Sequence, residues 1–217
     1  MLGVEEAIWR HAAQNPHKTA VVSGKDSATY GQLAARIAAT KEYLKKLPGY
    51  APGKAVVLAA NKQIEFIYAY FGAHLAGLTV VPIDSETNPT RFSFITETIK
   101  PICVIGFDKE DCGINKISLR EFKHFNEIEA AATPPAVDFP DKDATADILF
   151  TTGTTGTPKG VPLTFVNEAA SARNINCFIQ NGENDVELLA LPISHSFGLG
   201  RVRCCLLNGQ KIILLGS

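Results

Sequence analysis

The sequence predicts an α/β fold in which stacked, mostly parallel β-sheets carry helices on both faces. Short apolar runs alternate with helical stretches along most of the chain. Several of these runs, such as KAVVLAA at residues 54–60, are apolar throughout, which a sheet covered on both faces requires. Residues 54–83 form a strand, a helix ended by Gly77 and a second strand, the basic unit of a parallel sheet.

Each expected element has a local signal. The first helix is amphipathic, Ser27 to Tyr30 open the second, Pro48-Gly49 end it, and Asn88-Pro89 open the fourth. We expect helices at residues 4–13, 27–47, 64–76, 88–99, 166–180 and 197–207. We expect strands at residues 19–22, 54–60, 78–83, 101–105, 146–151, 161–165, 186–191 and 210–215.

The segment from Phe107 to Lys142 breaks this alternation. It is charged and contains the turn-forming runs AATPP and DFPDKD, which indicate a surface excursion and a linker. We therefore predict a first α/β lobe at residues 1–140 and the start of a second at residues 141–217. The chain stops on the strand-like run IILLGS, and we expect the natural protein to continue, because so apolar a strand normally leads into more structure.

Composition and charge exclude several classes of protein. Hydrophobic residues make up 46% and charged residues 20% of the 217 residues, which excludes disorder. The net charge of −1 provides no field for nucleic acid, and no apolar stretch reaches the ~20 residues of a membrane span. No secretory signal begins the chain. We interpret the five cysteines (Cys103, Cys112, Cys177, Cys204, Cys205) as structural thiols, and we expect a cytoplasmic protein.

The chemical signal lies in the segment Thr151 to Gly160, TTGTTGTPKG, directly after the strand ADILF. Glycines allow a tight turn and a close backbone approach to a ligand, and successive turn amides form a nest for an anion. Threonine hydroxyls and the Lys159 ammonium add donors and positive charge. The segment therefore predicts a polyphosphate site. It differs from the common P-loop, because Lys159 lies between proline and glycine and no hydroxyl residue follows it.

Phe150 to Gly160 (FTTGTTGTPKG) closely resembles the signature loop of the adenylate-forming enzymes, which include acyl- and aryl-CoA synthetases, adenylation domains of nonribosomal peptide synthetases and firefly luciferase. Two further stretches resemble the family in the same order, LAGLTVVPID at residues 75–84 and LPISHSFGL at residues 191–199. A weaker similarity, TYGQL at residues 29–33, completes a likeness over essentially the whole chain. The SHSFG version is closest to the fatty-acyl and aryl ligases.

The resemblance implies an ATP-dependent ligase that joins a small carboxylic acid to a thiol through an acyl-adenylate. Its cofactors would be ATP with Mg²⁺, and its acyl acceptor coenzyme A or the phosphopantetheine of an acyl carrier protein. The implied catalytic residues are His195, beside the acyl pocket and the reacting carboxylate, and Lys159. The implied ligands of the β- and γ-phosphates are Thr151, Thr152, Gly153, Thr154, Thr155, Gly156 and Lys159.

The sequence departs from the family pattern in two ways. Phe165 stands where the family often has a histidine. The family's Tyr-Gly-x-Thr-Glu segment, its ribose-binding aspartate and its carboxy-terminal lysine are absent, and in the family all lie downstream of the last residue here. The resemblance therefore implies an amino-terminal piece without the carboxy-terminal domain, which alone binds nucleotide poorly and does not turn over.

Two other functions fit the residues. An unrelated phosphate-binding enzyme, such as a kinase, could use the same loop chemistry and would need no carboxylate. A naturally short, non-catalytic binding or regulatory protein derived from such a ligase would have a stop codon after Ser217. The coding sequence beyond Ser217 discriminates between this naturally short protein and a piece of a longer ligase.

The remaining polar residues have structural interpretations. The sequence predicts that His74 packs on an apolar helix face, that Asp84 makes a turn and that Asn167 caps a helix. We expect the following residues at the surface: His11, His17, His124, Arg201 and Arg203.

Overall fold

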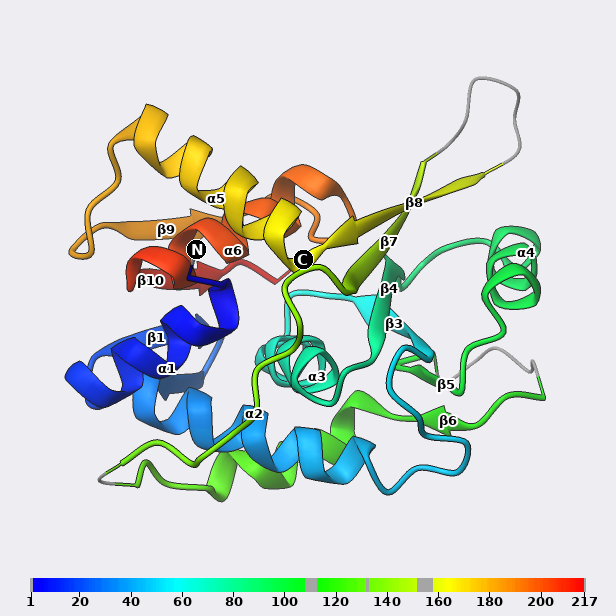
Figure 1. Cartoon of the computed structure of the whole chain (residues 1–217), viewed down its shortest axis with the longest axis horizontal. Helices are drawn as coiled ribbons and strands as arrows, with labels where there is room; N and C mark the ends of the chain where they lie inside the picture. Colours follow the sequence, from blue (N-terminus) through cyan, green and yellow to red (C-terminus); the bar gives the residue numbers. More distant parts are fainter. Residues whose placement is uncertain (1, 108–112, 132, 152–157, 217) are drawn as a thin grey trace.

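The computed structural model describes residues 2–107, 113–131, 133–151 and 158–216, and it confirms the predicted α/β fold (Figure 1). Two β-sheets, of six and four strands, are flanked by helices, and most of the strand pairs are parallel. Within the described ranges, no helix combines the length and the hydropathy needed to cross a membrane.

The six-stranded sheet contains the unit that the apolar runs predict. Its order is β6-β5-β3-β4-β7-β8, with only β7 and β8 pairing antiparallel. The bounds are β3 Ala55–Ala60, β4 Thr79–Asp84, β5 Cys103–Ile105, β6 Lys116–Ile117, β7 Thr145–Thr151 and β8 Lys159–Thr164.

The four-stranded sheet joins the two ends of the chain. Its order is β2-β1-β10-β9, and β1 pairs in parallel with β10. The bounds are β1 Thr19–Ser23, β2 Asp26–Thr29, β9 Val186–Leu189 and β10 Lys211–Leu214. The sequence did not predict β2, which forms a hairpin with β1 through Gly24 at φ 59°. Each sheet thus combines strands from both sides of residue 140, and a lobe boundary there stays a prediction.

Several helices begin where a side chain caps their first amides. Thr29 accepts from the Gln32 amide, Asn88 from the Arg91 amide and Thr164 from the Asn167 amide. Asn167 caps the same helix, as predicted, from its third position: its Oδ1 accepts from the Thr164 amide at 3.1 Å, so the two residues form a capping box. The bounds are α1 Val4–Gln14, α2 Tyr30–Leu44, α3 Ile64–Leu75, α4 Pro89–Ile99, η1 Leu119–Glu127, α5 Phe165–Ile179 and α6 Ser196–Asn208.

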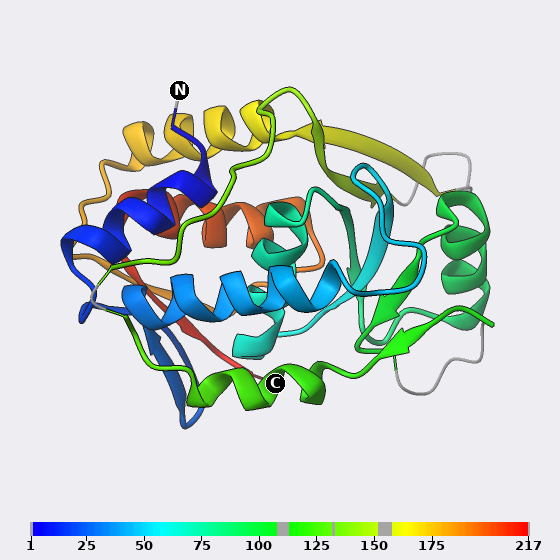
Figure 2. The same cartoon turned by 60° about the horizontal axis from the view of Figure 1, so that its bottom comes forward.

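Helix α3 lies at the centre of the molecule, as both views show (Figures 1 and 2). Every residue of α3 is buried, since its sequence IEFIYAYFGAHL is apolar around nearly the whole circumference. The helices α1, α2 and α6 complete the same core. A central helix of this kind leaves no water for its polar side chains, so those side chains must find partners inside the protein.

Most of the described cysteines are buried in the protein interior. Cys103, Cys204 and Cys205 are buried free thiols, Cys177 is exposed, and Cys112 is outside the described residues. Burial raises the pKa of Cys205 to about 12, so this thiol is unreactive at neutral pH.

Candidate functional site

The predicted site residues that the structure describes, Thr151, Lys159 and His195, lie at or beside the carboxyl ends of the parallel strands, the edge where open α/β sheets bind ligands. The strands β4 and β7 pair at Val80 and Asp147. Four residues beyond that pair, Asp84 and Thr151 end the two strands at the same height. Thr151 therefore lies at the carboxyl end of β7, four residues beyond the point where β7 pairs with β4.

Thr151 and Lys159 begin and end the phosphate-loop segment, and the structure brings them together. The two residues are partners in the antiparallel pairing of β7 and β8. The hydroxyl of Thr151 lies 3.5 Å from the Lys159 carbonyl oxygen, at the long limit of a hydrogen bond. The Lys159 side chain is exposed and makes no hydrogen bond or ion pair with any described residue. The other predicted phosphate ligands, Thr152 to Gly156, lie outside the described residues.

His195 is the residue that precedes α6, and its exposed ring contacts no described residue through a hydrogen bond. Its neighbour Ser194 donates to Asp84 Oδ2 at 3.3 Å, which holds the start of α6 against the end of β4. Asp84 also makes the predicted turn, because its Oδ1 accepts from the Glu86 amide at 2.9 Å. His195 thus lies on the same edge of the sheet as Thr151, although no contact joins the two.

Gly198 keeps this segment compact. A Cβ atom at Gly198 would lie 2.1 Å from the Pro192 carbonyl oxygen and 2.8 Å from its carbon, both backbone atoms. We expect Gly198→Ala to lower the free energy of unfolding by about 1–3 kcal/mol, because the backbone from Pro192 to His195 must move away from α6. Urea unfolding checks this, with Gly200→Ala as the matched control. Gly200 has no atom near its Cβ position, so that helical substitution should be neutral or stabilising.

Lys62 links the carboxyl ends of the two sheets. Its Nζ donates to the Ala190 carbonyl at 2.6 Å, just after β9, and the Ser23 hydroxyl at the end of β1 donates to the Lys62 carbonyl at 2.8 Å. The ends of β1, β3 and β9 are therefore tied together. The edge that carries Thr151 and Asp84 is continuous with the edge of the smaller sheet.

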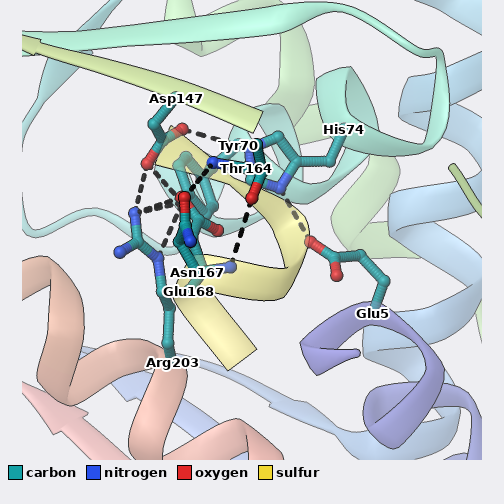
Figure 3. A network of polar contacts seen from close by, with 8 residues as sticks. All are labelled: Glu5, Tyr70, His74, Asp147, Thr164, Asn167, Glu168 and Arg203. Carbon is teal, nitrogen blue, oxygen red and sulfur yellow. Dashed lines mark hydrogen bonds and ion pairs between the residues drawn. The ribbon is translucent and has the colours of Figure 1, made fainter. Parts of the chain in front are cut away.

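A buried network of charged side chains lies beneath this edge (Figure 3). His74 is completely buried on α3, with Nδ1 2.8 Å from Glu5 Oε1 and Nε2 3.1 Å from Asp147 Oδ1. The Tyr70 hydroxyl donates to Asp147 Oδ2 at 2.8 Å. The network therefore joins α1 and α3 to β7, the strand that leads into the phosphate loop.

Arg203 of α6 completes the network. Its Nη2 pairs with Asp147 Oδ2, and both Nε and Nη2 contact the Tyr70 hydroxyl, at 3.0 and 2.7 Å. Arg203 Nη2 also lies 2.9 Å from Glu168 Oε1 of α5, an ion-pair distance without the angles of a hydrogen bond. Helices α3 and α6 therefore both bind Asp147 of β7 through their side chains.

Burial and neighbouring charges shift the pKa values of the side chains in the network. Burial alone would lower the pKa of His74, but hydrogen bonds with Asp147 and Glu5 and their charges raise it to about 10. Burial, reinforced by the Asp147 charge, raises the pKa of Glu168 well above its ordinary value. Against the effect of burial, the charge of Arg203 and the hydrogen bond from His74 lower the pKa of Asp147. The raised pKa of His74 and the lowered pKa of Asp147 favour an ion pair between these two buried side chains at neutral pH.

The same residues have the composition of a metal site. Ligand atoms of His74, Asp147 and Glu168 lie within 4.8 Å of one another. Both ring nitrogens of His74 are already bound to carboxylates, and the Arg203 guanidinium supplies positive charge between the two acids. A divalent cation would meet two existing cations, so the geometry favours an ion-pair network over a metal centre.

Three sequence predictions about polar residues are wrong. Arg201 and Arg203 are 6% and 5% exposed, and Arg201 pairs with Glu187 at 2.7 Å. His11 is 7% exposed, and its Nε2 lies 3.1 Å from the Leu207 carbonyl oxygen. The prediction of surface positions follows from the usual exposure of charged side chains, and the partners that bury these residues lie 14 to 196 positions away in sequence.

His74 is buried as predicted, yet its role as the centre of an ion network was not foreseen. The sequence signal was the presence of one histidine, two tyrosines and one glutamate in a helix that is otherwise apolar. Such residues need polar partners when buried, but the sequence does not say which.

Two pockets lined by described residues lie away from the predicted site. One of about 410 Å³ lies at the opposite ends of β4 and β7, lined in part by Thr79 and Thr145. Another of about 310 Å³ lies between the starts of α1 and α5, beside Glu5 and Phe165. Neither contains a predicted site residue. We assign the site to the carboxyl edge, because sequence and strand register agree there.

Known proteins are similar to this chain in sequence. The 2-succinylbenzoate–CoA ligase of Bacillus licheniformis is 27% identical over 212 residues, which are 95% of this chain and 44% of that protein. Bacitracin synthase 1, also of Bacillus licheniformis, is 27% identical over 214 residues, which are 98% of this chain and 4% of that protein. The chain therefore spans less than half the length of these relatives.

Solved structures share the fold. The inhibitor-bound N-terminal domain of FACL13 from Mycobacterium tuberculosis has a TM-score of 0.86 and 26% identity, and the match covers 100% of this chain and 58% of that one. MatB from Rhodopseudomonas palustris, solved with ATP, has a TM-score of 0.82 and 22% identity, over 99% of this chain and 45% of that one. The sequence pattern of the AMP-binding enzymes matches residues 8–217, and this chain belongs to that family of adenylate-forming ligases.

Proposed function

We propose that this chain is the phosphate-binding part of an ATP-dependent ligase that converts a carboxylic acid to an acyl-adenylate and then to a thioester. The observation that carries the proposal is the segment TTGTTGTPKG, which leaves the carboxyl end of β7 and returns at Lys159 as β8. Its composition suits a polyphosphate, and its place in the fold is the ligand-binding edge of an α/β sheet.

The relatives support the same chemistry. The 2-succinylbenzoate–CoA ligase joins a carboxylate to coenzyme A, as its name states, and MatB was solved with ATP. The acceptor thiol here would belong to coenzyme A or to the phosphopantetheine of a carrier protein. Because the chain covers only part of each relative, turnover is proposed for the whole protein and not for these residues alone. We place the reaction in the cytoplasm.

In the first half-reaction, a carboxylate oxygen attacks the α-phosphorus of ATP, which enters as its magnesium complex, and the bond to pyrophosphate breaks. Negative charge increases on the departing β- and γ-phosphates. Lys159 and the loop amides would stabilise that charge, and fixed donors are effective because they need no reorganisation. His195, at the start of α6, would lie beside the carboxylate.

The test is carboxylate-dependent exchange of labelled pyrophosphate into ATP by the full-length gene product that contains these residues. We expect Lys159→Ala to slow exchange on the order of tenfold to a hundredfold, since one cation is lost from the leaving group. Short-chain, medium-chain and aromatic carboxylates serve as substrates. The matched control is Lys25→Ala, an exposed lysine in the turn between β1 and β2, which should exchange normally. Equal rates for Lys159→Ala and wild type would contradict the proposal, as would exchange that needs no carboxylate.

A further inference from the structure

Arg91 reaches from α4 to the end of β7. Its Nη2 donates to the Phe150 carbonyl oxygen at 3.1 Å. Phe150 is the residue directly before Thr151, where the phosphate-loop segment begins. Arg91 lies in the first turn of α4, where its own amide is capped by Asn88 Oδ1 at 2.8 Å. The guanidinium is therefore presented from a fixed helix end.

The Phe150 carbonyl lies on the part of β7 that no longer pairs with β4. The strands β4 and β7 pair at Val80 and Asp147, and beyond this point the β7–β8 hairpin projects from the sheet (Figure 1). Ile148 and Phe150 pack against a cluster formed by residues of β3, β4 and α4, which include Val81 and Phe92. Arg91 of α4 adds the hydrogen bond to the backbone.

Apolar packing alone does not fix where a strand end points, because side chains can slide over one another at little cost. A charged hydrogen bond to a carbonyl is directional and stronger than a neutral one. Arg91 forms no ion pair with any described residue, and the other N–H groups of its guanidinium make no hydrogen bond there. The Phe150 carbonyl is thus the polar group that holds this guanidinium in the described chain.

We propose that Arg91 is a positioning residue for the phosphate loop: it holds the Phe150 carbonyl so that Thr151, where the loop segment begins, faces the leaving pyrophosphate. The inference rests on the proposed function. It names α4, which none of the predicted site residues belongs to, as the element that fixes the entry of the loop.

The contact can be tested directly in this chain, without turnover. Phe150-Thr151 is the one Phe-Thr pair in the sequence. A sample labelled with ¹³C-carbonyl phenylalanine and ¹⁵N-threonine therefore gives a single carbonyl–amide correlation in NMR. We expect Arg91→Ala to move the Phe150 carbonyl resonance upfield, as a lost hydrogen bond does, and Arg91→Lys to move it less. An unchanged resonance in Arg91→Ala would overturn the inference.

The functional test compares kinetic constants of the full-length gene product in pyrophosphate exchange. We expect Arg91→Ala to reduce kcat on the order of tenfold to a hundredfold, because a misplaced loop loses transition-state alignment. KM for ATP should change less, and Arg91→Lys should recover part of kcat. The control Lys100→Asn removes the positive charge at the other end of α4, where Lys100 has φ 52° and asparagine tolerates that conformation.

Each outcome is decisive. If wild type shows no carboxylate-dependent exchange, the proposed function fails, while the NMR result on Arg91 stands. If wild type exchanges and Arg91→Ala lowers only the melting temperature, Arg91 has a structural role and the inference fails. If Arg91→Ala raises KM for ATP at constant kcat, the guanidinium binds the nucleotide, and the positioning role is wrong.

Discussion

Replacing Asp147 by alanine is expected to lower the free energy of unfolding by about 3–5 kcal/mol, the usual cost of breaking a buried ion pair by removing one partner. Asp147 is fully buried and accepts hydrogen bonds from Tyr70, His74 and Arg203. Its loss removes the shared hydrogen-bond and ion-pair partner of two buried side chains, His74 and Arg203. Urea unfolding of the 217-residue chain measures the difference.

The matched control is Asp143→Asn, in the exposed turn just before β7. Its side chain makes no contact with a described residue, so a change within about 0.5 kcal/mol is expected. A change of the same small size for Asp147→Ala would show that the network contributes nothing to stability.

Asp147→Asn should be milder than the alanine variant, because the amide keeps a hydrogen-bonding group beside Tyr70 and Arg203. Both variants also remove a charge that acts on Glu168. The Asp147 charge is one of the causes that raise the pKa of Glu168. Without that charge, Glu168 can lose its proton and balance Arg203, which lies 2.9 Å away. The double variant Asp147→Asn, Glu168→Gln removes this compensation. Its loss in free energy of unfolding should exceed the sum of the losses in the two single variants.

Raising the pH should destabilise the protein through His74. The folded pKa of His74 is about 10 against an ordinary value of 6.5, so the folded state holds this proton more tightly than the unfolded state does. The resulting stabilisation is complete below about pH 6.5 and is lost as pH rises to about 10. Its size is several kcal/mol, on the order of 5. The raised pKa of Glu168 acts in the same direction.

The free energy of unfolding, measured in urea at several pH values from 6 to 10, checks this expectation. Because lysines, tyrosines and thiols also titrate at alkaline pH, the comparison is with His74→Gln, which cannot bind the proton. The variant should be much less stable than wild type near neutral pH, and the gap should narrow toward pH 10. A constant gap across this range would mean that His74 is neutral in the folded protein.

The described elements show why some of the architecture could be predicted. The strands β3 and β4 and the helix α3 are long, apolar and bounded by glycine, so local signals agree with the final fold. The strand β2 (DSAT) was missed because it is polar and short, and its extended form is imposed by pairing with β1. The 3₁₀ helix η1 was missed in the same way, since it lies in a segment with turn-like composition.

In the candidate site too, features set by consecutive residues could be predicted, and contacts between distant residues could not. The loop motif, the strand before it and the family likeness could all be read from consecutive residues, because their chemistry depends on local order. Arg91, Asp84 and Lys62 gave no such signal. Their partners are the Phe150 carbonyl, the Ser194 hydroxyl and the Ala190 carbonyl, each at least 59 positions away.

From consecutive residues alone, then, the chain reveals its parallel strands, its helices and its phosphate-loop motif, because these depend on periodicity and on local backbone chemistry. The charge states of His74, Glu168 and Arg203, and the attachment of α4 and α6 to β7, are set by the packed fold. An ionisable group takes its pKa from its distance to other charges and to water, and those distances exist only after distant segments have come together.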